Sequence, residues 1–222
     1  MTSVLHLRIR RLIWDAVCIM VPLLLMGCSG SILVPFEIQQ GVERAEWAFI
    51  PTDESWMNFP GATLVVERRF AGVREQRSLL PNHTFMPGDN FAHLRAVPPS
   101  DGALLSLDRA LMRAGGLPGP FVKDDLNVMR ARDDAAGTLN WSEWTGGAGT
   151  TCVLAIRRLS ISARVLPNQA IALDMVMRNC VRGDAAAALA PAAPEAVAFG
   201  APYGANRGAK QRTLSPLAAP VP

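Results

Sequence analysis

The stretch IALDMVMRNC at residues 171–180 begins with large apolar side chains on alternate positions and ends in a cysteine. The alternating positions are occupied by Ile171, Leu173, Met175 and Met177. A period of two is typical of a β-strand that turns one face toward a hydrophobic core. We therefore expect a strand here, with this apolar face directed inward.

A partner for this strand is expected directly upstream. The run CVLAI at residues 152–156 is continuously apolar, as is typical of a central strand, and a turn is expected near residues 167–168. If the two strands pair antiparallel, Cys152 and Cys180 at their outer ends come together. The pattern and a disulfide between these cysteines therefore support each other.

Three more strands are expected in the preceding part of the chain. Residues 63–70, TLVVERRF, are rich in β-branched side chains and become charged toward their end. Residues 75–80 can return as the hairpin partner, and the turn signal PGDN precedes a third strand at residues 91–97. The expected inner face of that third strand consists of Ala92, Leu94 and Ala96.

One helix is expected over Ala103–Ala114. Its apolar positions follow the spacing of a helix face, Ser100 or Asp101 can cap its start, and the glycines at residues 115–116 can end it. Those apolar positions are Leu104, Leu107 and Leu111. Hairpin-type strand pairs with few long crossovers favour an α+β fold, with a mainly antiparallel sheet and one packed helix.

The N-terminus has the layout of a bacterial lipoprotein signal peptide. Three arginines precede an apolar run at residues 16–26, which is too short for a permanent span of about 20 residues. Leu25-Met26-Gly27-Cys28 resembles the lipobox, and this resemblance implies cleavage after Gly27 and acylation of Cys28. Because Ser29 and not Asp follows, we expect an outer-membrane anchor that faces the periplasm.

Cleavage at this site leaves a nearly neutral chain with two free cysteines. The removed segment carries three Arg and one Asp, so the net charge falls from +3 to about +1 and offers no electrostatic case for nucleic acid. Cys18 leaves with the signal and Cys28 takes lipid, so Cys152 and Cys180 are expected to form a disulfide in the oxidising periplasm. His83 and His93 have no ligand-like spacing to either cysteine, and no metal or other cofactor is expected.

The chain is expected to divide into four parts. Residues 1–27 form the signal peptide, residues 28–59 a membrane-proximal spacer that ends in a segment packed on the domain, and residues 60–182 the α+β domain. Residues 183–222 are rich in Ala and Pro and are expected to be a disordered tail, because this composition buries little large apolar surface.

Few residues suggest chemistry, and no catalytic constellation is visible. The glycine-rich loop at residues 146–149 has no lysine and precedes a strand, so it does not fit a phosphate loop. Arg68 and Arg69 belong to a basic edge on the first hairpin. This edge is most simply a solvated strand face, and the alternative is a contact with a partner or a glycan. Trp141 and Trp144 point to opposite faces of one strand, so one of them could be exposed and contact a partner or a sugar ring.

These residues resemble the cellulose biosynthesis protein BcsN family of alphaproteobacteria. The resemblance lies in residues 61–71, GATLVVERRFA, in Glu75 and Gln76, in residues 87–91, PGDNF, and in the glycine-rich loop that leads to Cys152 with a later strand ending at Cys180. It covers roughly residues 60–182 and implies a small accessory protein of bacterial cellulose synthase, with no known catalytic residues to carry over. The Ala/Pro-rich end departs from the family.

Two classes of function therefore compete. The first is a non-enzymatic accessory lipoprotein of cellulose or another exopolysaccharide, anchored in the membrane by its lipid and acting on proteins of the secretion complex. The second is a pilus- or envelope-assembly lipoprotein that binds a secretin or the cell wall. Gene neighbours would separate the two, because a cellulose synthase operon supports one and a pilus operon the other.

Overall fold

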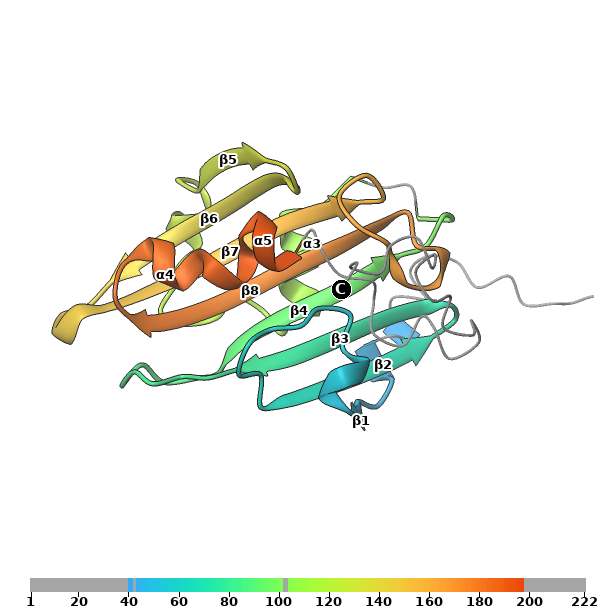
Figure 1. Ribbon diagram of the computed structural model, residues 1–222, viewed down its shortest axis with the longest axis horizontal. Coiled ribbons are helices and arrows are strands. Elements are labelled where there is room, and N and C mark those ends of the chain that lie inside the picture. Colours follow the sequence, from blue (N-terminus) through green and yellow to red (C-terminus); the bar gives the residue numbers. More distant parts are fainter. Residues whose placement is uncertain (1–39, 42, 102–103, 198–222) are drawn as a thin grey trace, which may run out of the picture. The chain divides into compact units, whose positions relative to one another are not determined.

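The computed structural model describes residues 40–41, 43–101 and 104–197, all within the compact unit that begins at Gln39. These residues form one eight-stranded sheet (Figure 1). Its strands are β1 (Ala48–Ile50), β2 (Leu64–Phe70), β3 (Val73–Leu80), β4 (Asn90–Val97), β5 (Arg130–Asp134), β6 (Gly137–Thr145), β7 (Thr150–Ser160) and β8 (Ala172–Arg182). The helices are α3 (Leu107–Arg113), α4 (Ala185–Leu189) and α5 (Pro194–Val197), with short 3-10 turns η1 (Thr52–Glu54), η2 (Lys123–Leu126), η3 (Gly147–Gly149), η4 (Pro167–Gln169) and η5 (Ala190–Ala192).

The sheet is antiparallel throughout, in the order β1-β2-β3-β4-β8-β7-β6-β5. The expected mainly antiparallel sheet is thus confirmed. Pairing of β4 with β8 joins the meander β1 to β4 to the meander β5 to β8. The two longest strands, β7 and β8, have eleven residues each and lie next to each other near the middle of the sheet.

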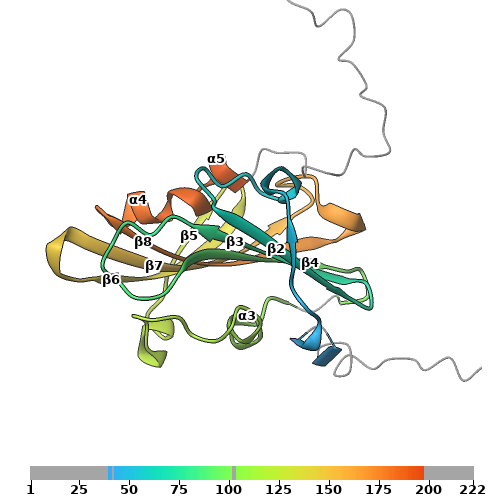
Figure 2. The same cartoon turned by 90° about the horizontal axis from the view of Figure 1, so that it is seen from below.

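Both faces of the sheet are covered (Figure 2). One face packs against α4, η5, α5 and the segment around Trp56 and Phe59, and its core includes the expected face of Ala92, Leu94 and Ala96. The other face packs against α3 and Phe121. Because α3 covers this second face, β4 is buried on both sides, as is expected of a central strand with helices on each face.

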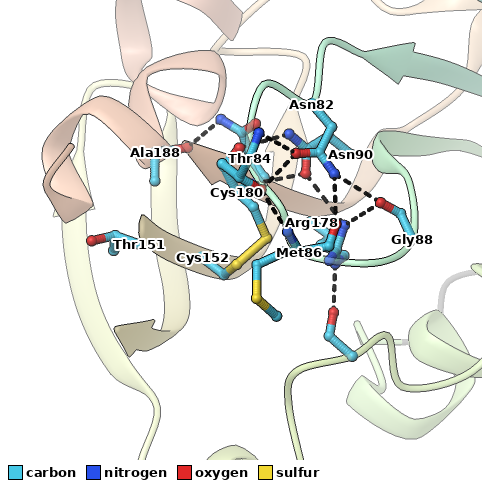
Figure 3. Close-up of a disulfide and its surroundings, with 12 residues drawn as sticks. Asn82, Thr84, Met86, Gly88, Asn90, Thr151, Cys152, Arg178, Cys180 and Ala188 are labelled. Atoms are coloured by element: carbon cyan, nitrogen blue, oxygen red, sulfur yellow. Dashed lines mark hydrogen bonds between the residues drawn. A yellow bond between two sulfur atoms is a disulfide. The ribbon is translucent and has the colours of Figure 1, made fainter. Parts of the chain in front are cut away.

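Cys152 and Cys180 form a disulfide between directly opposed positions of β7 and β8 (Figure 3). Their Cα atoms are 3.9 Å apart, within the limit of about 7 Å for a bridge. The expected antiparallel pairing of these strands is confirmed. The side-chain amide of Asn90 donates to the carbonyl of Cys180 and accepts from its N–H, both at 2.8 Å, so the start of β4 is fixed to the same point.

The helix over residues 103–114 exists but is shorter than expected, and its cap is different. It begins after Ser106, whose hydroxyl accepts a hydrogen bond from the N–H of Arg109, and not after Ser100 or Asp101. Its last turn ends as expected at Gly115 and Gly116, which adopt φ angles of +101° and +95° that glycine accommodates without strain. Leu111 is buried, whereas Leu104 precedes the helix and is exposed.

The expected disorder of residues 183–222 is wrong for its first part, because residues 184–197 fold onto the sheet. Small alanines allow this segment to approach the strands closely, and polar side chains of the sheet bind its carbonyls. Asn179 donates to the carbonyl of Ala188 at 2.8 Å and Arg157 to that of Ala192 at 2.7 Å. A prediction of disorder from composition counts large apolar side chains, so it does not anticipate an alanine-rich segment that packs closely on a sheet. Residues 198–222 lie outside the described residues.

The domain also begins before residue 60. β1 lies inside the segment expected to be a spacer and pairs with β2. In the same segment, Trp56, Met57 and Phe59 are core residues. The expectation that this segment ends in a part packed on the domain is thereby confirmed, with an earlier boundary. The rest of the spacer, residues 28–39, and the signal peptide lie outside the described residues. In the described part of the chain, we find no helix with the length and apolarity needed to cross a membrane.

We predict that replacing both Cys152 and Cys180 by alanine lowers the free energy of unfolding by about 3–4 kcal/mol. The disulfide closes a loop between residues separated by 28 positions, and a loop of that size restricts the unfolded chain by about this amount. Urea unfolding of the oxidised wild type and of the variant measures the difference. Equal midpoints for the two proteins would show that the bond adds no stability.

Candidate functional site

Five neighbouring strands each place one charged residue at the same level of the sheet, on the face covered by α3. This charge row runs across β2, β3, β4, β8 and β7 in the order Arg68, Glu75, Arg95, Asp174 and Arg158. Each residue is the direct cross-strand partner of the next, and the signs alternate. Opposite charges at directly opposed positions stabilise a sheet, whereas like charges there destabilise it.

Short ion pairs hold the two ends of the charge row. Arg68 Nη2 lies 2.6 Å from Glu75 Oε2. Arg158 donates twice to Asp174, from Nε at 2.5 Å and from Nη2 at 2.9 Å. Paired hydrogen bonds between a guanidinium and a carboxylate are among the strongest polar contacts in proteins.

Arg95 connects these two ends at the centre of the row. Its Nε lies 3.9 Å from Glu75 Oε1, and its Nη1 lies 4.0 Å from Asp174 Oδ2. Its strongest partner is Asp101, at 2.6 Å from Nη2, in the segment between β4 and α3. Because Arg95 is buried, removal of one of these carboxylates would leave a charge without full compensation.

Other parts of the chain cover the row. The guanidinium of Arg68 stacks on Trp47, with its Cζ 4.5 Å from the ring centroid, as in a cation–π contact. Over the other end lies α3, where a cavity of about 10 Å³ has room for about one water. The cavity is bounded by charged side chains of the row and of its cover, which are Arg95, Asp101, Arg109, Arg113, Arg158 and Asp174.

His93 lies in the neighbouring row, with its Nε2 3.7 Å from Glu75 Oε2. Neither ring nitrogen has a hydrogen-bond partner. Burial, reinforced by nearby arginines beginning with Arg68, lowers the pKa of His93 to about 3, so the imidazole is neutral at pH 7. Burial also raises the pKa of Glu75 and outweighs the opposite effect of Arg68. The carboxyl of Glu75 and the imidazole of His93 therefore form a buried pair. The positive charges of the nearby arginines disfavour protonation of the imidazole.

A second charged cluster occupies the opposite face of the same hairpin, centred on Glu67. Arg74 donates to both carboxylate oxygens at 2.7 and 2.8 Å, Gln76 donates at 2.9 Å, and Arg69 also donates to this carboxylate. Burial raises the pKa of Glu67, but these hydrogen bonds outweigh it and the net shift is downward. Gln76 also accepts from the N–H of Trp56 at 2.8 Å, which links the cluster to the packed N-terminal segment.

The predicted basic edge is therefore not a single solvated surface. Arg68 and Arg69 are consecutive in β2 and point to opposite faces. The side chain of Arg68 is 7% exposed and is held in the charge row, whereas that of Arg69 is 65% exposed and reaches back to Glu67. The expectation is wrong for Arg68 because Trp47 and the neighbouring strands cover it, a contact that the spacing of residues 68–77 does not reveal.

Trp141 and Trp144 point to opposite faces of β6 as expected, but neither is an exposed platform. Trp141 packs against the core under α4, and Trp144 packs against the core that contains Cys152. The ring of Trp144 lies directly against Gly146, where a Cβ would clash with it. The two rings are therefore half-buried on opposite faces of β6, and neither stands fully exposed for a partner or a sugar ring.

Of the expected site residues, the structure brings together Cys152 and Cys180, while Cys28 lies outside the described residues. In residues 40–197, apart from the gaps at 42 and 102–103, no group of three or more His, Cys, Asp or Glu side chains could hold a metal ion. The charge row was missed by sequence reasoning. Successive members along the chain are separated by 7, 20, 63 and 16 positions, so only the strand register could have revealed them.

We predict that Asp174→Asn lowers the free energy of unfolding by up to about 3 kcal/mol, the low end of the range for breaking a buried ion pair, since Arg158 is partly exposed. Glu143→Gln is the matched control, because it breaks the exposed pair with Arg130 and should cost less than about 1 kcal/mol. Urea unfolding at pH 7 compares the two variants. Similar losses would contradict a stabilising role of the charge row.

We also predict that His93 makes the protein less stable in mild acid. Since its folded-state pKa of about 3 lies below the unfolded value near 6.5, stability is fully present above pH 6.5 and is lost as the pH falls toward 3. Between pH 7.5 and pH 5 this loss is about 2 kcal/mol. His93→Phe should remove it, whereas His83→Phe, at an exposed site, should retain it. Unfolding curves at both pH values decide, and identical pH dependence in the two variants would contradict the prediction.

Comparison of the chain with protein-family models, with curated proteins and with solved structures finds no match. The roles given to Glu75, His93, Arg95 and Asp174 accordingly rest on their own contacts, burial and charges.

Proposed function

We propose that this chain is a non-enzymatic lipoprotein of the bacterial cell envelope. It is anchored through Cys28, faces the periplasm, most simply from the outer membrane, and acts by protein contacts as an accessory factor in the synthesis or export of cellulose or a related exopolysaccharide. Its partners in this proposal are the membrane, through the lipid, and proteins of the polysaccharide secretion complex.

Two observations carry the envelope location. Residues 25–28 resemble a lipobox, and the structure has a disulfide between two central strands of the sheet. Structural disulfides persist in oxidising compartments such as the periplasm and are rare in the cytosol of ordinary bacteria. The two features are independent of each other, and both favour export.

The accessory role is supported by where the residues of the family resemblance lie. Residues 61–71 cover β2, Glu75 and Gln76 lie in β3, and residues 87–91 lead into β4. The later part of the resemblance ends on Cys152 and Cys180 in β7 and β8. These five strands are adjacent in the sheet, so the segments behind the resemblance belong to one continuous structural unit.

The non-enzymatic assignment is supported by the way in which the charged residues are used. Glu75, Arg95 and Asp174 are buried in the charge row and contact one another or nearby charges through ion pairs. Catalytic acids and bases must reach a substrate, whereas these groups are covered by α3 and Trp47. This arrangement favours a structural role for the charge row, and we expect the functional contacts to be made by surface residues.

We predict that deletion of the gene lowers bound Congo red in colonies, while the synthase activity of isolated membranes stays unchanged. The wild-type gene should restore dye binding, and Cys28→Ser should restore little of it because the chain would lose its lipid. Ser29→Ala is the matched control, since it leaves the lipobox intact. Normal polymer output in the deletion strain, together with a defect in piliation, would contradict the proposal and favour the assembly role.

A further inference from the structure

The connection between β7 and β8, residues 161–171, exposes three large apolar side chains. Ile161 is 76% exposed, Val165 62% and Ile171 44%. Single exposed apolar residues are common on protein surfaces, but a group of them on one loop often marks a contact with a membrane or a partner. The β7–β8 connection is therefore a candidate interaction surface.

The same connection carries no exposed charge. Its sequence contains no Asp, Glu or Lys, and its one charged residue is Arg164. The guanidinium of Arg164 is buried and donates to the carbonyl of Trp56 at 2.6 Å and to that of Val197 at 3.2 Å. Contact of this loop with an apolar phase would therefore not require a charged group to lose its water, which is the main cost of such contacts.

The β7–β8 connection lies at the end of the sheet to which the N-terminal segment is attached. In the strand register, Leu159 at the end of β7 is level with Arg69 near the end of β2. The ring of Phe70, the last residue of β2, lies directly against Gly41. Figure 1 shows the β7–β8 connection and the β2–β3 turn at the same end of the strands.

The length of the chain ahead of this point limits its distance from an anchor at Cys28. Eleven residues separate Cys28 from Gln40, and at about 3.3–3.6 Å per residue they span at most about 40 Å. This reach is long enough for the end of the sheet that carries the apolar loop to touch a bilayer in which Cys28 is anchored.

We propose that the β7–β8 connection is a membrane-contact loop, which places Ile161 and Val165 at the boundary between lipid headgroups and acyl chains. This inference rests on the proposed anchoring through Cys28 and adds a second, non-covalent attachment. Lipid and loop together fix the orientation of the domain, with the strands rising from the membrane. A second attachment to the same bilayer also holds a protein more firmly than the first does alone.

The test uses the full acylated protein in phosphatidylethanolamine and phosphatidylglycerol vesicles that carry a nitroxide on the acyl chain near the headgroup. Val165→Cys and Ile161→Cys are labelled with the fluorophore NBD, while Cys152 and Cys180 stay joined in the disulfide. Val128→Cys is the matched control, because Val128 is also an exposed valine, at 75%, and lies ahead of β5 away from this loop. Circular dichroism confirms that each variant is folded.

The expected result is that NBD at positions 165 and 161 loses most of its fluorescence to the nitroxide, whereas NBD at position 128 loses little. Equal quenching at all three positions, on protein that floats with the vesicles, would overturn the membrane-contact loop and leave the anchoring intact. Protein that does not float with the vesicles would overturn the anchoring through Cys28 and this inference with it. The two failures are therefore distinguishable.

Discussion

The pairing of β4 with β8 is the constraint on which the rest of this fold depends. Residues 91–97 pair with residues 172–178, and this contact converts two separate meanders into one sheet. Polar side chains reinforce it from both strands. Asn90 binds both backbone groups of Cys180, and Arg178 donates to the carbonyls of residues 87–89 in the turn before β4 (Figure 3). The disulfide then ties the same end of β8 to β7, so three neighbouring strands are fixed at one point.

That pairing also explains how a small domain can bury so many charges. Buried charges are costly unless partners are close, and the alternating signs of the charge row supply partners from strand to strand. A slip of two residues between β4 and β8 would place Arg95 opposite Val176 and Asp174 opposite Val97. Both charges would then face apolar side chains, so the row penalises this wrong register. We interpret the charge row as a device that specifies how the two halves of the sheet meet.

Several elements of this fold could be predicted from the sequence because their causes are local. A period of two and β-branched residues indicated β2, β4 and β8. The disulfide was indicated because only two cysteines remain once Cys18 leaves with the signal peptide and Cys28 takes lipid. The neighbour relation of β4 and β8 depends on residues about 80 positions apart, and the charge row follows from that relation, so neither has a local signature. The strand β5, with the sequence RARDD, lacks apolar alternation because it is an exposed edge. The packing of residues 184–197 on the sheet was not predicted, because alanines pack by close approach and not by size.

The arrangement of the sheet restricts where a partner can bind. Both faces are covered, β1 is a short edge strand of three residues, and β5 is charged, so neither edge readily accepts another strand. The described residues leave open, among other places, loops at the two ends of the strands. The β7–β8 connection lies at one end, and the loop with exposed Phe85, which stacks on Arg182 at the end of β8, lies at the other. If lipid occupies the first end, the second points away from the membrane and is the end that proteins of the periplasm can reach.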